Sequence, residues 1–94
     1  LEAANISVSA ELYNAWTVFT NNYELLQIEE QNIVFAREVL LIANERFRVG
    51  ASNYTEQLEA QRTFEEAMKR LADARYFAKL SETRLRKLNG ELVK

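Results

Sequence analysis

Cysteine, histidine and proline are all missing from this chain of 94 residues, and glycine occurs only at Gly50 and Gly90. Without cysteine there is no disulfide, no thiolate nucleophile and no zinc–thiolate site. Without histidine the chain lacks the commonest general base and metal ligand. Because proline and glycine mark most turns, a chain so poor in both is expected to be almost wholly helical.

Neither the charge nor the hydropathy of the chain indicates a nucleic-acid-binding surface or a membrane-spanning helix. The 12 basic and 14 acidic residues leave a formal net charge of −2, and no segment is strongly basic. We therefore expect no nucleic-acid partner. No apolar run approaches the roughly 20 residues that a membrane-spanning helix needs.

A first long helix is predicted over about residues 10–49. Nothing in this stretch interrupts the coiled-coil spacing, in which seam residues follow one another at alternating intervals of three and four. The seam read from this spacing comprises Leu12, Trp16, Phe19, Tyr23, Leu26, Glu30, Ile33, Arg37, Leu40, Asn44 and Phe47. Two interpretations of its polar members stay open. They set the register where the seam turns towards water, or they line an aqueous lumen.

The same helix carries a second apolar stripe on a neighbouring face. Its members are Leu25, Ile28, Phe35, Val39, Ile42 and Val49. Two apolar stripes need two partners, so further helices are expected to pack against this one.

A second helix is predicted over residues 54–89, with a regular packing seam. That seam contains Ala60, Phe64, Ala67, Leu71, Ala74, Ala78, Ser81 and Leu85. Small residues recur in it at exact sevens, which permits two helix axes to approach more closely than usual. We expect this seam to carry the packing of the two helices.

A turn of about four residues, 50–53, is predicted between the helices. Gly50 can adopt the left-handed conformation that ends helices. Asn53 is a good N-cap, and Glu56 stands three residues later, as in a capping box. A connection this short makes the helices antiparallel. The predicted fold is all-α: a long antiparallel helical hairpin of coiled-coil type.

Catalysis is not expected from these residues. Adjacent glutamates occur at 29–30 and 65–66, but neighbours on a helix point about 100° apart and do not converge on one substrate. Most aromatic residues lie at heptad spacing and are interpreted as packing residues. Tyr54, beside the turn, has two interpretations: a staple against Phe47 or a contact with a partner.

Residues 43–92, ANERFRVGASNYTEQLEAQRTFEEAMKRLADARYFAKLSETRLRKLNGEL, resemble the closing helical hairpin of TolC-like outer-membrane efflux proteins. That family reads approximately R-[YF]-x-x-G-x-x-[ST]-Y-x-[DE]-x-L-x-A-Q, followed by an alanine-rich helix. The matching residues are Arg46, Phe47, Gly50, Tyr54, Glu56, Leu58, Ala60 and Gln61. Asn53 replaces the usual Ser or Thr, and Thr55 and Gln57 replace residues that are commonly apolar. The likeness is looser over 10–42 and absent over 1–9.

The resemblance implies that residues 1–94 form a single helical-hairpin segment of a larger, trimeric outer-membrane efflux protein. The segment would lie in the periplasm as part of a tunnel, a passive conduit for multidrug efflux or type I secretion, with no cofactor. Membrane contact would come only from parts of the larger protein that this sequence does not contain. Its tip would dock a periplasmic adaptor protein that links the tunnel to an inner-membrane pump. The implied adaptor-contacting residues are Arg46, Arg48, Val49, Gly50, Ala51, Ser52, Asn53 and Tyr54.

Two alternatives from other classes remain. One is a standalone coiled coil that dimerises into a four-helix bundle, and the other is the hairpin of an adaptor protein itself. Because the sequence begins at Leu1 rather than at methionine, we expect an excised segment of a longer parent. Outer-membrane strands and a second hairpin in that parent would favour the channel, whereas lipoyl-like strands would favour the adaptor.

Overall fold

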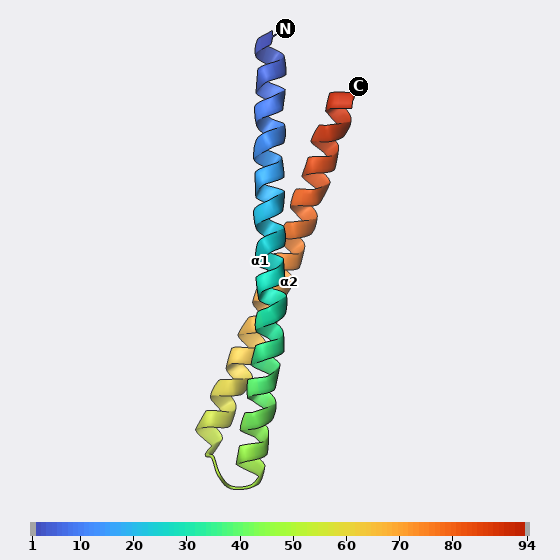
Figure 1. The fold of residues 1–94 in the computed structure, drawn as a ribbon. Coiled ribbons are helices and arrows are strands. Elements are labelled where there is room, and N and C mark those ends of the chain that lie inside the picture. The colour runs from blue at the N-terminus through green and yellow to red at the C-terminus, as the bar shows by residue number, and fades with distance from the viewer. Residues whose placement is uncertain (1, 94) are drawn as a thin grey trace. The chain divides into compact units, whose positions relative to one another are not determined.

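Two long helices make up the chain in the computed structural model, which describes residues 2–93 and the side chains of residues 7 and 9–90. Helix α1 is Glu2–Arg48 and helix α2 is Tyr54–Val93. The chain reverses between them at residues 49–53 (Figure 1). No strand occurs among residues 2–93. The predicted all-α helical hairpin is thereby confirmed.

The helix ends lie further out than the predicted limits near residues 10 and 89. No proline or glycine precedes residue 10, so nothing stops α1 from beginning at Glu2. Gly90 stays within α2, because a helical glycine costs only about 1 kcal/mol relative to alanine. At the turn, α1 ends at Arg48, one residue earlier than predicted.

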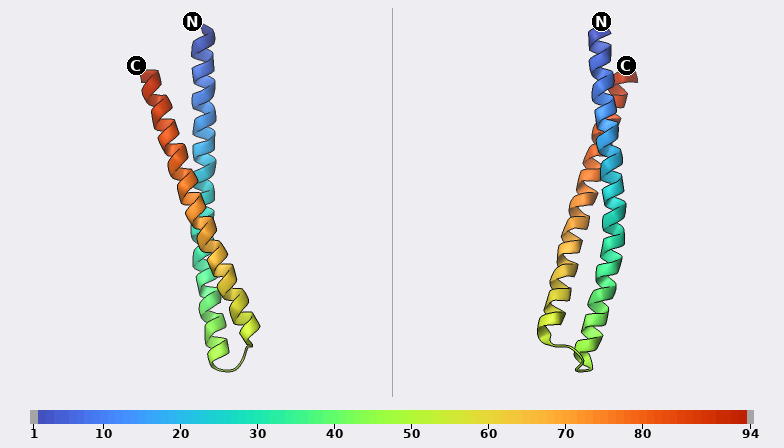
Figure 2. Two further views of the ribbon diagram at one scale, coloured as in Figure 1. Left: turned by 180° about the vertical axis from the view of Figure 1, so that it is seen from behind. Right: turned by 60° about the vertical axis from the view of Figure 1, so that its left-hand side comes forward.

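The helices contribute to two compact units. Residues 27–73, which we call the hairpin unit, contain the turn with the end of α1 and the start of α2. Both views in Figure 2 show these two stretches side by side next to the turn. The terminal unit consists of the described parts of residues 1–26 and 74–94.

The predicted seam of α2 is the face that is withdrawn from solvent. Ala67 is only 2% exposed, and Leu71 is 7% exposed. The other buried members are Ala60, Ala74, Ala78 and Ser81. Phe64 and Leu85 are half-buried. Apart from Gln57, Glu82 and Leu88, which are half-buried, the remaining described side chains of α2 are exposed.

The predicted seam of α1 is wrong at every second position and also at its last member, Phe47, which is 40% exposed. Trp16 is 55% exposed and Tyr23 is 38% exposed. The polar members Glu30, Arg37 and Asn44 are exposed as well. The buried or half-buried positions lie one residue earlier, at Ala15, Asn22, Glu29, Ala36 and Ala43.

Side-chain size accounts for this shift. The seam of α2 carries alanine or serine every seventh residue, so the facing positions of α1 are best filled by small side chains such as Ala15, Ala36 and Ala43. An indole at that place would hold the two backbones apart. The predicted positions that both seams share, Leu12, Phe19, Leu26, Ile33 and Leu40, are buried or half-buried.

The second apolar stripe of α1 stays uncovered. The exposed fractions of its six side chains range from 38% at Val39 to 69% at Phe35. Within residues 2–93 neither helix has the length and apolar character required to cross a membrane.

Candidate functional site

Backbone hydrogen bonds close α1 at its turn end. Gly50 has a φ of +78°, in the left-handed region. The Ala51 amide donates to the Arg46 carbonyl at 2.8 Å, and the Gly50 amide donates to the Phe47 carbonyl at 3.1 Å. These two bonds define a Schellman motif, which satisfies carbonyls that the helix end leaves free. The predicted left-handed Gly50 is therefore confirmed, and most side chains other than asparagine or aspartate would strain the backbone there.

The start of α2 is capped by side chains. The Asn53 Oδ1 accepts a hydrogen bond from the Glu56 amide at 2.9 Å, so the predicted N-cap is confirmed. The Glu56 carboxylate accepts a hydrogen bond from the Ser52 hydroxyl. Glu56 therefore ties the middle of the turn to the first turn of α2.

Both arginines of the tip are engaged within the chain. The Arg46 Nη2 donates to the Ala51 carbonyl at 3.5 Å. The Arg48 guanidinium forms a bidentate pair with the Glu45 carboxylate, with Nε 3.1 Å from Oε2. Hydrogen bonding to Glu45 raises the pKa of Arg48 above its ordinary value. The two charges are thus held in place along the flank of α1 by their own neighbours.

An aromatic pair bridges the two helices beside the turn. The rings of Phe47 and Tyr54 meet edge to face, with centroids 6.2 Å apart. The proposed staple between these residues is therefore present. Tyr54 remains 63% exposed, so the same ring also offers a surface to the outside.

The outer side of the turn is open. A Cβ atom added at Gly50 would meet nothing within 4 Å. The tip residues 46–54 are all exposed except Ser52, which is half-buried. The tip is a small, hydrogen-bonded surface with an exposed backbone and an exposed aromatic ring. Among the described residues no cluster of acidic side chains could hold a metal ion.

Side chains beside the seam join the helices within the hairpin unit. Asn44 Oδ1 accepts a hydrogen bond from Gln57 Nε2 at 2.9 Å. The Arg37 guanidinium lies over the Phe64 ring, 5.9 Å from its centroid. Both contacts come from α1 positions that the sequence placed inside the seam, and both run along its flank instead.

Glu29 is the residue whose role the sequence did not reveal. It is buried, 7% exposed, and its Oε2 lies 3.1 Å from the Arg70 Nε. Its position in a series with Ala15, Asn22, Ala36 and Ala43 was visible in the sequence. From the sequence alone a glutamate in such a series is expected to be exposed, because its partner on the other helix is not known.

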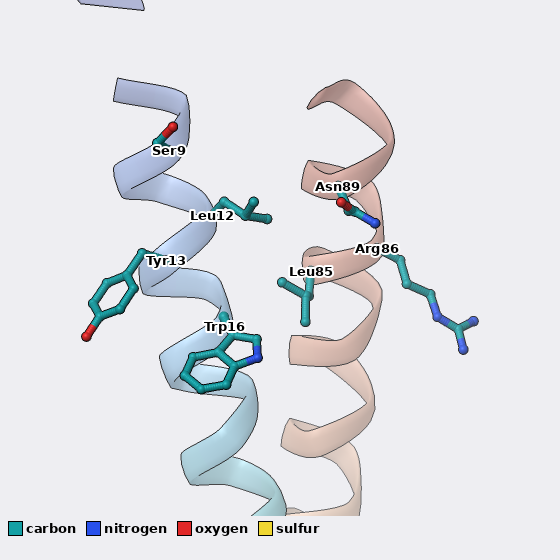
Figure 3. Close-up of a pocket in the computed structure, with 7 residues that line it drawn as sticks. All are labelled: Ser9, Leu12, Tyr13, Trp16, Leu85, Arg86 and Asn89. Carbon is teal, nitrogen blue, oxygen red and sulfur yellow. The ribbon is translucent and has the colours of Figure 1, made fainter. Parts of the chain in front are cut away.

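An open groove in the terminal unit lies beside the seam. Figure 3 shows Leu12 and Leu85 pointing towards one another, while Tyr13 and Arg86 point away. The groove is also lined by Ser9, Trp16 and Asn89. Leu85 thus lies in the packing seam, and the indole of Trp16 flanks it.

Comparison with protein families gives one result for nearly the whole chain. The model of a family described as outer membrane efflux protein matches residues 1–91. Searches of curated proteins and of solved structures gave no significant match. The family match includes residues 10–42, where the likeness in sequence is looser. It also begins at residue 1, so the expectation that the likeness is absent over residues 1–9 was wrong. The chain belongs to the outer membrane efflux protein family, as a component of an outer-membrane efflux channel.

Proposed function

We propose that the chain is the periplasmic tunnel segment of a trimeric outer-membrane efflux channel, and that its tip docks a periplasmic adaptor protein. In this proposal residues 1–94 are one helical hairpin of a larger subunit. The channel is a passive conduit for drugs or for secreted proteins, and the adaptor connects it to an inner-membrane pump. The family match supports the channel and weighs against a standalone coiled coil or an adaptor hairpin.

The tip is the observation that carries the docking proposal. Its backbone is held by the Schellman motif at Gly50 and by the Asn53 cap. A turn that is already ordered loses little conformational freedom on binding. The small residues Gly50, Ala51 and Ser52 let a partner helix end approach the backbone closely. The exposed ring of Tyr54 adds apolar area beside that approach.

The uncovered stripe of α1 supports assembly into a bundle. Its side chains are exposed over a long stretch, with Phe35 at 69% and Ile42 at 61%. Exposed apolar surface of this extent marks an interaction site. Neighbouring helices of the same channel, from the rest of the subunit or from other copies, are the proposed cover.

Replacing Gly50 by asparagine in the complete parent protein tests the docking proposal. Asparagine tolerates the left-handed conformation, so the turn is retained while a side chain projects into the open space at the tip. We expect loss of adaptor-dependent export, measured as drug resistance of cells that depend on the variant. The amount of channel in the outer membrane should be unchanged.

Gly90→Ala is the matched control, because Gly90 lies inside α2 and its position is also open. It should export normally and be slightly more stable, by up to about 1 kcal/mol. Normal export by Gly50→Asn, at equal channel abundance, would argue that the tip contacts no adaptor.

An immunoblot of fractionated source cells tests the claim that the chain is one segment of a channel subunit. An antibody against residues 1–94 should detect a band several times larger than the segment, in the outer membrane. A band of segment size in the soluble fraction would leave the free-standing coiled coil as the better account.

A further inference from the structure

Side-chain contacts cross from α1 to α2 at several places in the described hairpin unit, and one of them lies inside the packing seam. Asn44 and Arg37, which contact Gln57 and Phe64, are exposed and lie on the flank of the seam. Glu29 differs from both because it is buried. Because the Glu29 carboxylate is buried, it needs a hydrogen-bonding or cationic partner on the facing helix more than the exposed groups do.

Both oxygens of the Glu29 carboxylate have a partner. Oε2 accepts a hydrogen bond from the Arg70 Nε at 3.1 Å, across the hairpin. Oε1 accepts one from the Asn32 Nδ2 at 2.9 Å, one helical turn along α1. The Glu29 side chain is 9% exposed, whereas that of Arg70 is 51% exposed. Arg70 thus reaches in from the surface to neutralise a charge that lies inside the seam.

The alanine series of the seam does not by itself specify one axial register. On α2 the alanines Ala60 and Ala67 are seven residues apart, and on α1 so are Ala36 and Ala43. Sliding α2 by one heptad, about 10 Å, replaces each alanine by an equivalent one. The alanine series taken alone therefore fits in more than one register, although the large residues beside it, Phe64 and Leu71, differ in size.

Glu29 removes this ambiguity. A slide by one heptad would bring Thr63 or Phe77 to the place of Arg70. The carboxylate would then lie in the seam without a cation. Leaving a buried carboxylate without its cation is unfavourable, although the ion pair itself need not stabilise the fold. A single polar residue in a coiled-coil seam is known to select register at some cost in stability.

We propose that Glu29, held by Arg70 and Asn32, is the positioning residue that fixes the axial register of α2 against α1 in the hairpin unit, independently of the turn. Glu29 precedes the turn by some 20 residues, about 30 Å along α1. The turn can then change conformation without allowing the helices to slide. This role does not depend on which partner, if any, the tip binds.

Distance measurements in a chain with a loosened turn test the proposal. One heptad of glycine and serine is inserted after Ala51, so that the turn no longer limits a slide. Because the chain has no cysteine, Glu38→Cys and Lys69→Cys introduce two unique spin-label sites. Both sites are exposed and lie on different helices of the hairpin unit. Double electron–electron resonance then reports the axial offset between α1 and α2.

With Glu29 in place, the loosened chain should keep a single narrow distance. With Glu29→Leu it should show at least two populations whose axial offsets differ by about one heptad. Glu30→Leu is the matched control: Glu30 is the neighbouring, exposed glutamate, and its replacement should leave one distance. Circular dichroism of each variant establishes that the helices are formed.

The thermal midpoint separates a positioning role from a stabilising one. Glu29→Leu should unfold at the same temperature as the Glu29 chain or at a higher one, because an apolar residue replaces a buried charge. A single narrow distance in the loosened Glu29→Leu chain would overturn the proposal. Several distances, or a lost hairpin, in the loosened chain that retains Glu29 would overturn it as well.

Discussion

Ala67 is the most deeply buried side chain of the seam, and its replacement tests the close packing of α1 and α2 most severely. It is 2% exposed in the middle of the alanine series of α2. Ala67→Leu inserts a branched side chain of three further carbon atoms where α2 meets the hairpin unit's stretch of α1. Overpacking of this kind costs about 1–3 kcal/mol, because neighbouring side chains or backbones have to shift.

The expected loss is large enough to measure on the 94-residue chain. For a domain of this size, 1 kcal/mol corresponds to about 4–8 °C in the melting temperature. We expect Ala67→Leu to lower the midpoint of thermal unfolding, followed by circular dichroism, by at least about 4 °C. The free energy of unfolding from urea titration should fall by about 1–3 kcal/mol.

Two matched variants isolate the packing effect of Ala67→Leu. Ala72→Leu makes the same change at an exposed position of α2 and should be nearly neutral, since alanine and leucine have similar helix propensities. Ala67→Ser should cost less than Ala67→Leu. Serine already occupies the equivalent Ser81, where its hydroxyl donates to the Ala78 carbonyl at 2.9 Å. Equal stability of Ala67→Leu and Ala72→Leu would refute the reasoning.

Two further outcomes follow from the turn and from the corrected seam of α1. Asn53→Ala should cost about 1 kcal/mol in the free energy of unfolding, because the Glu56 amide loses its acceptor, and Asn53→Asp should retain most of that stability in the same urea titration. An unchanged stability of Asn53→Ala would show that the cap is dispensable. Trp16 is the chain's single tryptophan and is 55% exposed, so its fluorescence should be quenched readily by acrylamide in the folded chain. Protection from quenching would instead place Trp16 in a closed seam, as the heptad spacing alone had indicated.

Local signals allowed the turn to be predicted in detail. The left-handed Gly50 and the Asn53 cap depend on residues within a few positions of each other. The packing seam of α2 could also be located from the sequence, because alanine or serine recurs there at every seventh residue. Both features depend on residues that lie close together in the sequence.

Only one of the two sets of positions in the seam of α1 could be predicted from the sequence, and the reason is physical. A spacing of threes and fours that begins at Leu12 can proceed either to Ala15 or to Trp16, and both choices contain Leu12, Phe19 and Leu26. Hydrophobicity alone favours the large aromatic residue. The size of the facing residues on α2 favours the small one, and that information lies on the other helix. The ion pair between Glu29 and Arg70 was hidden for the same reason.

Photo-crosslinking in living cells is the most direct test of docking at the tip. A photoreactive amino acid at Ser52 of the complete parent protein places the probe on the open turn, and one at Thr63, an exposed residue well along α2, serves as the control. The account predicts a crosslink from Ser52 to a periplasmic adaptor protein of an inner-membrane pump, identified by mass spectrometry, and none from Thr63. Illumination that yields no adaptor crosslink from Ser52, in cells that export actively, would contradict it.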